Sequence, residues 1–436
     1  MNKSTGTVTT MAPRREIFAW AMFDFANSGY TTVVLTAVFN AYFVSTIAAS
    51  HGAAMATLLW TIAMAVSNAL VLLSAPVLGA MADYRADKKR FLAVTTLGCI
   101  VATAALALVR PDDLVLAMGL LILSNAMFAT GEGLIAAFLP ELVPADHMGR
   151  VSGLGWTLGY VGGLLVLGVC LVYVTWAQQQ GLPATQFVPV TLWITATAFA
   201  LASLPTFLWM KERAQAKPLP EGEHYIVLGF RRVVETLGHV RHYQDLFRFL
   251  ITLTVFYSGI YTVILLAAIY AQQVMGFTTR DTLILILVVN VTAAIGAFGF
   301  GIIQDRIGSI STLMATLLLW VAALLWVYAT SGLIHFWIAA NMIGLALGSS
   351  QSAGRALVGL FSPIARVGEF FGLWNLASRL AAIIGPLSYG AVIYVSGGNQ
   401  KLALLSTTVY FLIGIVLLSR VNEQRGRKIA ALQAEF

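Results

Sequence analysis

The chain has 436 residues, of which 59% are hydrophobic and only 10% are charged, and its mean hydropathy is +0.83. A soluble globular protein has roughly 25% charged residues, so this composition excludes a soluble protein and indicates a surface that mostly faces lipid. The net charge of +7 does not indicate nucleic-acid binding, because no basic patch is interleaved with aromatic residues on a soluble segment.

Twelve apolar runs follow one another along the chain, and each can cross a bilayer core about 30 Å thick as an α-helix. They cover approximately residues 20–47, 56–82, 91–109, 114–137, 153–175, 189–210, 246–270, 282–303, 310–329, 334–357, 370–395 and 402–420. The first, second and eleventh are longer than a straight crossing needs, so they must tilt or lie partly in the interface. The sequence therefore predicts an all-α integral membrane protein.

Basic residues are distributed unequally between the two sides of these runs. Alternate loops on one side, together with both termini, hold 21 of the 26 Lys and Arg residues; the other side holds three, and two lie inside the runs. Loops rich in Lys and Arg stay in the cytoplasm. We therefore expect a multi-pass protein of the cytoplasmic (inner) membrane with both termini in the cytoplasm.

Two charged loops repeat one pattern, G-x-x-x-D followed by basic residues. The first contains Gly79, Asp83 and Arg85, and the second contains Gly301, Asp305 and Arg306. The two aspartates are 222 positions apart in a chain whose half-length is 218, and a glycine motif recurs at Gly153 and Gly372, 219 positions apart. This spacing predicts two pseudo-symmetric six-helix bundles with a binding site between them, residues 1–210 and 246–436.

Residues 211–245 form the long polar segment that joins the predicted bundles. The segment begins as a Pro- and Glu-containing linker and continues with apolar residues on one helical face and arginines on another. The apolar positions are Phe230, Val233, Val234, Leu237 and Val240. This pattern predicts either an amphipathic helix along the cytoplasmic surface or a solvated linker with some helical character.

Four ionisable residues stand out inside the apolar runs, namely Asp24, Glu132, Arg355 and Arg379. A charge at bilayer depth costs about 3 kcal/mol on insertion scales, so such residues are functional candidates. The alternation of the runs places all four in the cytoplasmic half of the membrane. One interpretation is mutual pairing, with Arg379 in a gate or static ion pair. The other is that Asp24 or Glu132 takes up a proton, while Arg355 binds a substrate carboxylate.

Polar and aromatic residues of the first, fourth, seventh and tenth runs complete the predicted site. The expected substrate-binding residues are Asp24, Asn27, Tyr30, Asn125, Glu132, Tyr257, Tyr261, Asn341, Gln351 and Arg355. The chain has no catalytic or ATP-binding motif, so we expect no enzyme and no cofactor, and transport driven by a gradient. Cys99 and Cys170 lie inside apolar runs and indicate neither a disulfide framework nor a metal site.

The two charged loops resemble the signature loop of the major facilitator superfamily, G-x-x-x-D-[RK]-x-G-[RK]-[RK]. The resemblance implies that Asp83 and Asp305 each cap a neighbouring helix and pair with a basic residue, which latches the two halves on the cytoplasmic side. The first copy has one extra residue before its basic cluster. The second copy has Ser309 and Ile310 in place of the terminal basic pair.

A narrower resemblance covers most of the chain. The string W-x-x-x-D-x-A-N-S-x-Y at 20–30 and the string GRVSGLGWTLGYVGG at 149–163 are similar to the vacuolar-effluxer-like branch, which contains autophagy-related amino-acid exporters and bacterial relatives. Arg379 matches a basic position of that branch. The chain departs from it at Ser258-Gly259, where the branch has Asp-Gly, and at Glu132.

The resemblance implies a secondary transporter that exports a small solute, such as amino acids. We expect it to work by alternating access, to be coupled to protons and to be a monomer. One alternative is a proton-driven multidrug or metabolite exporter of the same fold. An alternative of another class is a membrane scaffold or sensor that transports nothing. Beyond the small-molecule substrate, protons and the lipid bilayer, we expect no partner.

Overall fold

The computed structural model describes residues 10–111, 113–214, 224–238 and 243–432, and within these ranges the secondary structure is entirely helical. The α-helices are α1 (Arg14–Tyr30), α2 (Phe39–Tyr42), α3 (Ala53–Arg85), α4 (Lys88–Leu106), α5 (Leu114–Ala136), α6 (Leu139–Leu142), α7 (Met148–Gln179), α8 (Ala184–Trp209), α9 (Tyr225–Gly238), α10 (Gln244–Gln273), α11 (Thr279–Ile307), α12 (Ser309–Ala329), α13 (Leu333–Phe361), α14 (Val367–Val395), α15 (Gln400–Ser406), α16 (Thr408–Leu418) and α17 (Glu423–Leu432). Short 3₁₀ turns cover Ala49–His51, Ala145–His147 and Ile364–Arg366.

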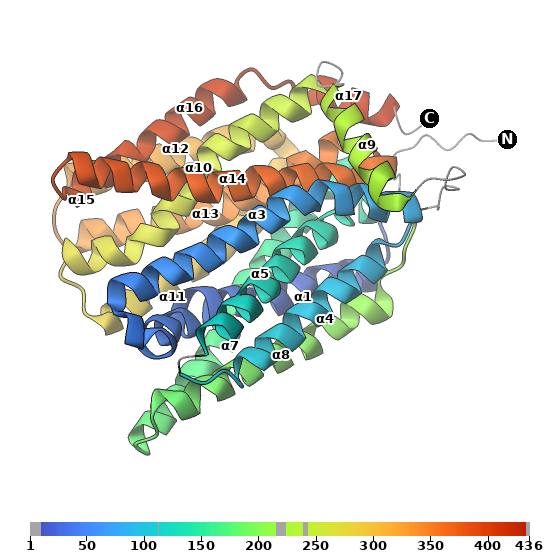
Figure 1. Ribbon diagram of the computed structural model, residues 1–436. Helices are drawn as coiled ribbons and strands as arrows, with labels where there is room; N and C mark the ends of the chain where they lie inside the picture. Colours follow the sequence, from blue (N-terminus) through green and yellow to red (C-terminus); the bar gives the residue numbers. More distant parts are fainter. Residues whose placement is uncertain (1–9, 112, 215–223, 239–242, 433–436) are drawn as a thin grey trace.

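Twelve helical segments of the described residues are long and apolar enough to cross a membrane, which confirms the predicted all-helical membrane fold. The spans lie side by side, and both ends of the chain emerge at one end of the bundle together with α9 and α17 (Figure 1). We call this end the terminal face. Large apolar side chains such as Val115, Leu208 and Leu387 are exposed on the outside of the spans, as expected for a lipid-facing surface.

The first span is the least regular. Its helical run, Arg14–Ile47, contains π-helical segments at Thr31–Ala37 and Phe43–Ile47. Such segments widen the helix locally and are frequent at functional sites. They also account for the unusual length of this apolar run, because the chain here does not continue as one straight α-helix.

Glycines allow two pairs of spans from opposite halves of the chain to touch at backbone distance. A Cβ atom on Gly79 of α3 would lie 2.0 Å from the carbonyl oxygen of Gly368 in α14. A Cβ on Gly301 of α11 would lie 2.7 Å from the carbonyl oxygen of Gly149 in α7. The internal repeat relates the two crossings, since Gly301 follows Gly79 by 222 residues and Gly368 follows Gly149 by 219.

These crossings join α1–α8 to α10–α16, which we call the N-terminal and C-terminal halves. The predicted domain limits at 210 and 246 stay a prediction. Residues 215–223 and 239–242 of the linker, including Val240, lie outside the described residues, whereas α9 shows that part of the linker is helical.

Candidate functional site

The two signature aspartates cap helices of the opposite half. Asp83, in the last turn of α3, accepts hydrogen bonds from the backbone N–H groups of Gly368 and Glu369 at the start of α14, both at 2.9 Å. Asp305, near the end of α11, accepts hydrogen bonds from Gly149 and Arg150 at the start of α7, at 2.8 and 3.0 Å. A carboxylate is favourable at the positive end of a helix, so each aspartate ties the halves together at the terminal face.

The surroundings of the two caps differ. Lys88, which is fully buried, pairs with Glu141 and lies 3.7 Å from Asp83 and 4.0 Å from Glu212. Burial is the largest influence on Glu212 and raises its pKa. Arg85, which we expected in the latch, contacts Asp87 at 3.5 Å and stacks over the Tyr225 ring.

The second cap borders a cavity instead of a buried lysine. Asp305 and Arg306 line this cavity of about 220 Å³ together with Arg427 and Glu423 of α17. Glu423 accepts hydrogen bonds from the backbone N–H groups at the start of α12, from Ser309 at 2.9 Å and from Ile310 at 3.1 Å. The acidic end of α17 thus occupies the place where the sequence lacks the terminal basic pair.

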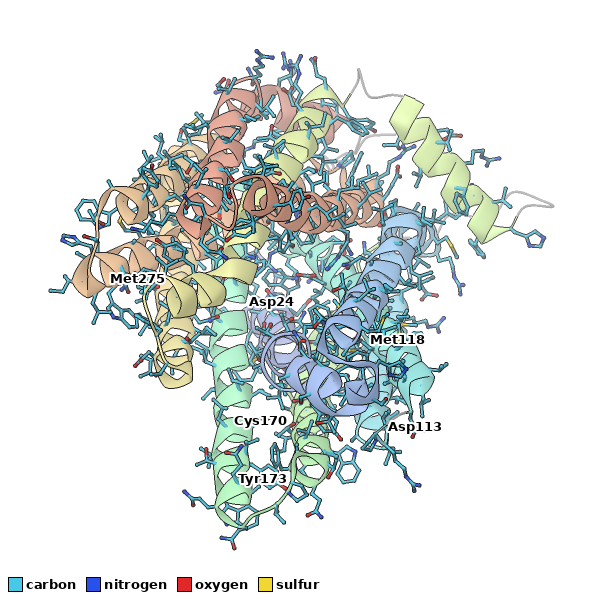
Figure 2. The ribbon with its side chains drawn as sticks, turned by 60° about the vertical axis from the view of Figure 1, so that its left-hand side comes forward. Asp24, Asp113, Met118, Cys170, Tyr173 and Met275 are labelled. Atoms are coloured by element: carbon cyan, nitrogen blue, oxygen red, sulfur yellow. The ribbon has the colours of Figure 1, made fainter. Side chains whose placement is uncertain are left out.

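A buried ion pair lies deeper in the bundle. Arg355 of α13 donates to Asp24 of α1 at 2.6 Å, and it also donates to the Ser152 hydroxyl at 3.1 Å and to the Ser152 carbonyl at 2.8 Å. The rings of Trp20 and Trp156 face the guanidinium, with centroids 4.7 and 5.4 Å from Cζ. Figure 2 shows Asp24 inside the bundle, where the two halves meet.

Arg355 is only 3% exposed, so in this conformation its donors are directed to protein groups. The predicted role of Arg355 as a carboxylate-binding residue would require this network to open first.

A second ion pair lies further from the terminal face. Arg379 donates to Glu132 at 2.9 Å and to the Asn375 amide oxygen at 3.1 Å. Arg379 is twelve residues beyond the start of α14, about 18 Å along the helix, whereas Arg355 is six residues from the end of α13, about 9 Å. The side chains of Glu132 and Arg379 are 29% and 13% exposed although each faces the opposite half. The protein atoms around this pair therefore cover it less completely than the Asp24–Arg355 pair.

A neutral pair occupies the position that the internal repeat relates to this ion pair. The Tyr160 hydroxyl donates to the Gln351 amide oxygen at 2.5 Å, and this bond joins α7 to α13. Gln351 follows Glu132 by 219 residues, and Arg379 follows Tyr160 by the same 219. Sequence reasoning missed Tyr160, although the 219-residue offset of the glycine motif would have identified it as the counterpart of Arg379.

Other predicted residues are directed elsewhere. Tyr30 bonds to the Ser124 hydroxyl at 2.8 Å, and Asn125 donates to the Ser67 hydroxyl at 2.9 Å; both are buried within the N-terminal half. Asn341 donates to the carbonyl of Trp337 on its own helix. The remaining residues of the set are Asn27, which is buried on α1, and Tyr257 and Tyr261, which meet edge to face with ring centroids 5.9 Å apart.

The structure thus brings Asp24, Glu132, Gln351, Arg355 and Arg379 together at the interface of the halves. It places Tyr30 and Asn125 away from that interface, in contacts within one half. Their proposed roles in substrate binding stay predictions.

Twelve spans in two related halves, joined by helix caps at one end and ion pairs at mid-depth, define a transporter of the major facilitator superfamily. Solved structures of this superfamily share the fold. The human organic anion transporter MFSD10 (TETRAN) aligns with a TM-score of 0.70 at 16% identity, over 93% of this chain and 99% of that one. A bacterial homologue of the iron transporter ferroportin, in an outward-facing state, aligns with a TM-score of 0.69 at 14% identity, over 94% and 99%.

The family is narrower than the fold. The model of the vacuole effluxer Atg22-like family matches residues 54–431, and the chain belongs to this family. The uncharacterized MFS-type transporter YxiO of Bacillus subtilis is 27% identical over 96% of this chain and 97% of its own length. Autophagy-related protein 22 of Yarrowia lipolytica is 24% identical over 71% of this chain, which spans 57% of that longer protein. The family consists of transporters, not enzymes.

Proposed function

We propose that this protein exports amino acids or similar small metabolites across the cytoplasmic membrane by alternating access, coupled to protons, with the terminal face in the cytoplasm. The observation that carries the proposal is the ion pair between Glu132 and Arg379. It joins the two halves, and yet its two side chains remain partly exposed. A partly exposed ion pair between moving parts can be reached by a proton or a ligand more easily than a fully buried pair.

The contacts at the terminal face correspond to one end of an alternating-access cycle. The Asp83 and Asp305 caps, the Asp24–Arg355 pair and the Glu132–Arg379 pair all join the halves on this side. Opening the terminal face requires these contacts to separate together. With the terminal face in the cytoplasm, the arrangement corresponds to a conformation closed to the cytoplasm.

The chemistry of the ion pair between Glu132 and Arg379 supports proton coupling. A proton on Glu132 removes one charge and releases Arg379. A substrate carboxylate can then take the place of Glu132 on the guanidinium fork, a geometry that suits bidentate binding. Proton and substrate binding would thereby be linked through one arginine.

The direction of transport and the class of cargo are inferred from the family and from the sequence. The family's description as vacuole effluxers suggests export, and the resemblance of the first span suggests amino acids. Asp24, whose carboxylate pairs with Arg355, is the second candidate proton site.

The test uses purified protein in liposomes and a panel of labelled amino acids, with and without a pH gradient. We expect flux of at least one amino acid, accelerated by the gradient, and loss of that acceleration in Glu132→Gln or Asp24→Asn. The same assay is run with labelled metabolites and drugs. Flux of these compounds without flux of any amino acid would exclude an amino-acid exporter and favour the alternative, a proton-driven multidrug or metabolite exporter. Absence of flux for every compound would favour a scaffold or sensor.

A further inference from the structure

Helix α9 lies across the ends of the spans at the terminal face, roughly perpendicular to them (Figure 1). Its inner side packs on α3: Leu228 and Gly229 are buried, and a Cβ on Gly229 would contact Val77 and Met81. Tyr225 packs edge to face on Tyr84. Only one side of α9 is thus covered by the N-terminal half.

The uncovered surface of α9 has two chemically distinct sides. Val227, Phe230 and Val234 are 56%, 56% and 65% exposed. At 100° per residue these three fall within a 60° arc. Arg231 and Glu235, which form an ion pair at 3.7 Å, lie on the adjacent arc and are also exposed. A helix with one packed, one apolar and one charged side fits a boundary between hydrocarbon and water.

The neighbouring surface identifies what covers the apolar side. The face of α3 that contacts α9 through Val77 and Met81 continues at helical spacing through Leu73 and Leu70, which are exposed. Leu73 is one turn from Val77, about 6 Å along the axis. In a membrane-spanning protein such exposed leucines face lipid. Helix α9 therefore packs on α3 next to exposed leucines of the lipid-facing surface, and its own exposed apolar side chains lie at the edge of the lipid-facing region.

Helix α9 also contacts the C-terminal half. Arg366, in the turn just before α14, donates to the Thr236 hydroxyl of α9 at 3.1 Å, and Thr236 is fully buried. This contact lies two residues before Gly368, the residue capped by Asp83. The helix thus bridges α3 and the start of α14 at the same place as the first cap.

We propose that α9 is an interfacial membrane helix that inserts Val227, Phe230 and Val234 into the lipid leaflet at the terminal face, and that this insertion holds α9 as a strap across the first cap and favours closure of that face. The partner is the bilayer itself. The proposal concerns a surface outside the ion-pair site and does not depend on which solute is transported.

The first test measures the surroundings of α9 in liposomes with spin labels at Val234→Cys and, as a matched control on the next residue, Glu235→Cys. The native Cys99 and Cys170 are buried, and an unmutated sample controls for their labelling. We expect a higher ratio of oxygen to nickel-chelate collisions at position 234 than at 235, because oxygen partitions into the bilayer. Equal ratios, which indicate water on both sides, or low collision rates with both reagents, which indicate a protein partner or a second copy, would overturn the proposal.

The second test asks whether insertion favours closure. Labels at the exposed Arg90→Cys and Arg420→Cys report the distance between the halves at the terminal face. We expect the double substitution Phe230→Gln and Val234→Gln to shift the distances towards longer values, while Glu235→Gln leaves them unchanged. If the double variant has the thermal stability of the parent protein and its label distances are unchanged, the proposal that α9 favours closure would be wrong.

Discussion

Glu132 and Gln351 occupy equivalent positions in the two halves, 219 residues apart, and each bonds across the interface to the other half. Only Glu132 carries a charge, and its partner Arg379 is the counterpart of the neutral Tyr160. The internal repeat therefore supplies two versions of one contact, and only one of them contains a carboxyl group that can take up a proton.

This asymmetry predicts that Glu132→Gln, which removes the titratable carboxyl group and leaves Arg379 charged, abolishes the response of transport to a pH gradient. The residual flux in proteoliposomes is expected to be independent of the gradient. The matched control is Tyr160→Phe, which removes the hydrogen bond of the neutral pair and leaves every ionisable group of the ion pair in place. Tyr160→Phe is expected to keep the pH response. A gradient-dependent flux in Glu132→Gln would exclude Glu132 as the coupling site.

The helix cap formed by Asp83 predicts an effect on conformation. Asp83→Ala leaves the N–H groups of Gly368 and Glu369 without their acceptor, and loss of an N-cap costs about 1 kcal/mol. Because this cap joins the halves, the closed terminal face should lose that amount relative to the open one. Spin-label distances between Arg90→Cys and Arg420→Cys are expected to report a larger open fraction.

Asp87→Ala is the control for the cap prediction. Asp87 is in the same loop but pairs with Arg85 and Arg90 of its own half, so its removal is expected to leave the distances unchanged. Identical distributions in Asp83→Ala and Asp87→Ala would contradict a role for the cap in closure.

Lys88, which lies 3.7 Å from the capping residue Asp83, is expected to stabilise the folded protein. Lys88→Met keeps the length of the side chain but removes the cation that pairs with Glu141 and that lies beside Asp83 and Glu212. Breaking a buried ion pair costs about 3–5 kcal/mol. We expect a clearly lower Tm in detergent, whereas Arg90→Met, at an exposed position of the same basic cluster, should leave the Tm nearly unchanged. Similar Tm values for the two variants would show that Lys88 contributes little.

The sequence was sufficient for the fold and for part of the site. Hydropathy identified the spans, and the 222-residue repeat located both capping aspartates, because these features depend on local patterns. The partners of the ionisable residues were not predictable in the same way. Asp24 meets a residue 331 positions away, and a sequence gives the depth and face of a side chain but not what lies opposite. Lys88 was missed because Glu141 and Glu212 converge on it only in three dimensions.

The crossing of α3 and α14 at Gly79, which joins the two halves, gives a steric prediction. Gly79→Ala places a methyl group 2.0 Å from the Gly368 carbonyl oxygen, a distance that real Cβ atoms do not reach, so α3 and α14 must separate at the terminal face. We expect Gly79→Ala to populate the open terminal face and to slow transport. Gly119→Ala is the matched control, because its Cβ meets nothing within 4 Å and Ala favours a helix over Gly by about 1 kcal/mol. Spin-label distances and flux that are the same in both variants would mean that the crossing can loosen without opening the face.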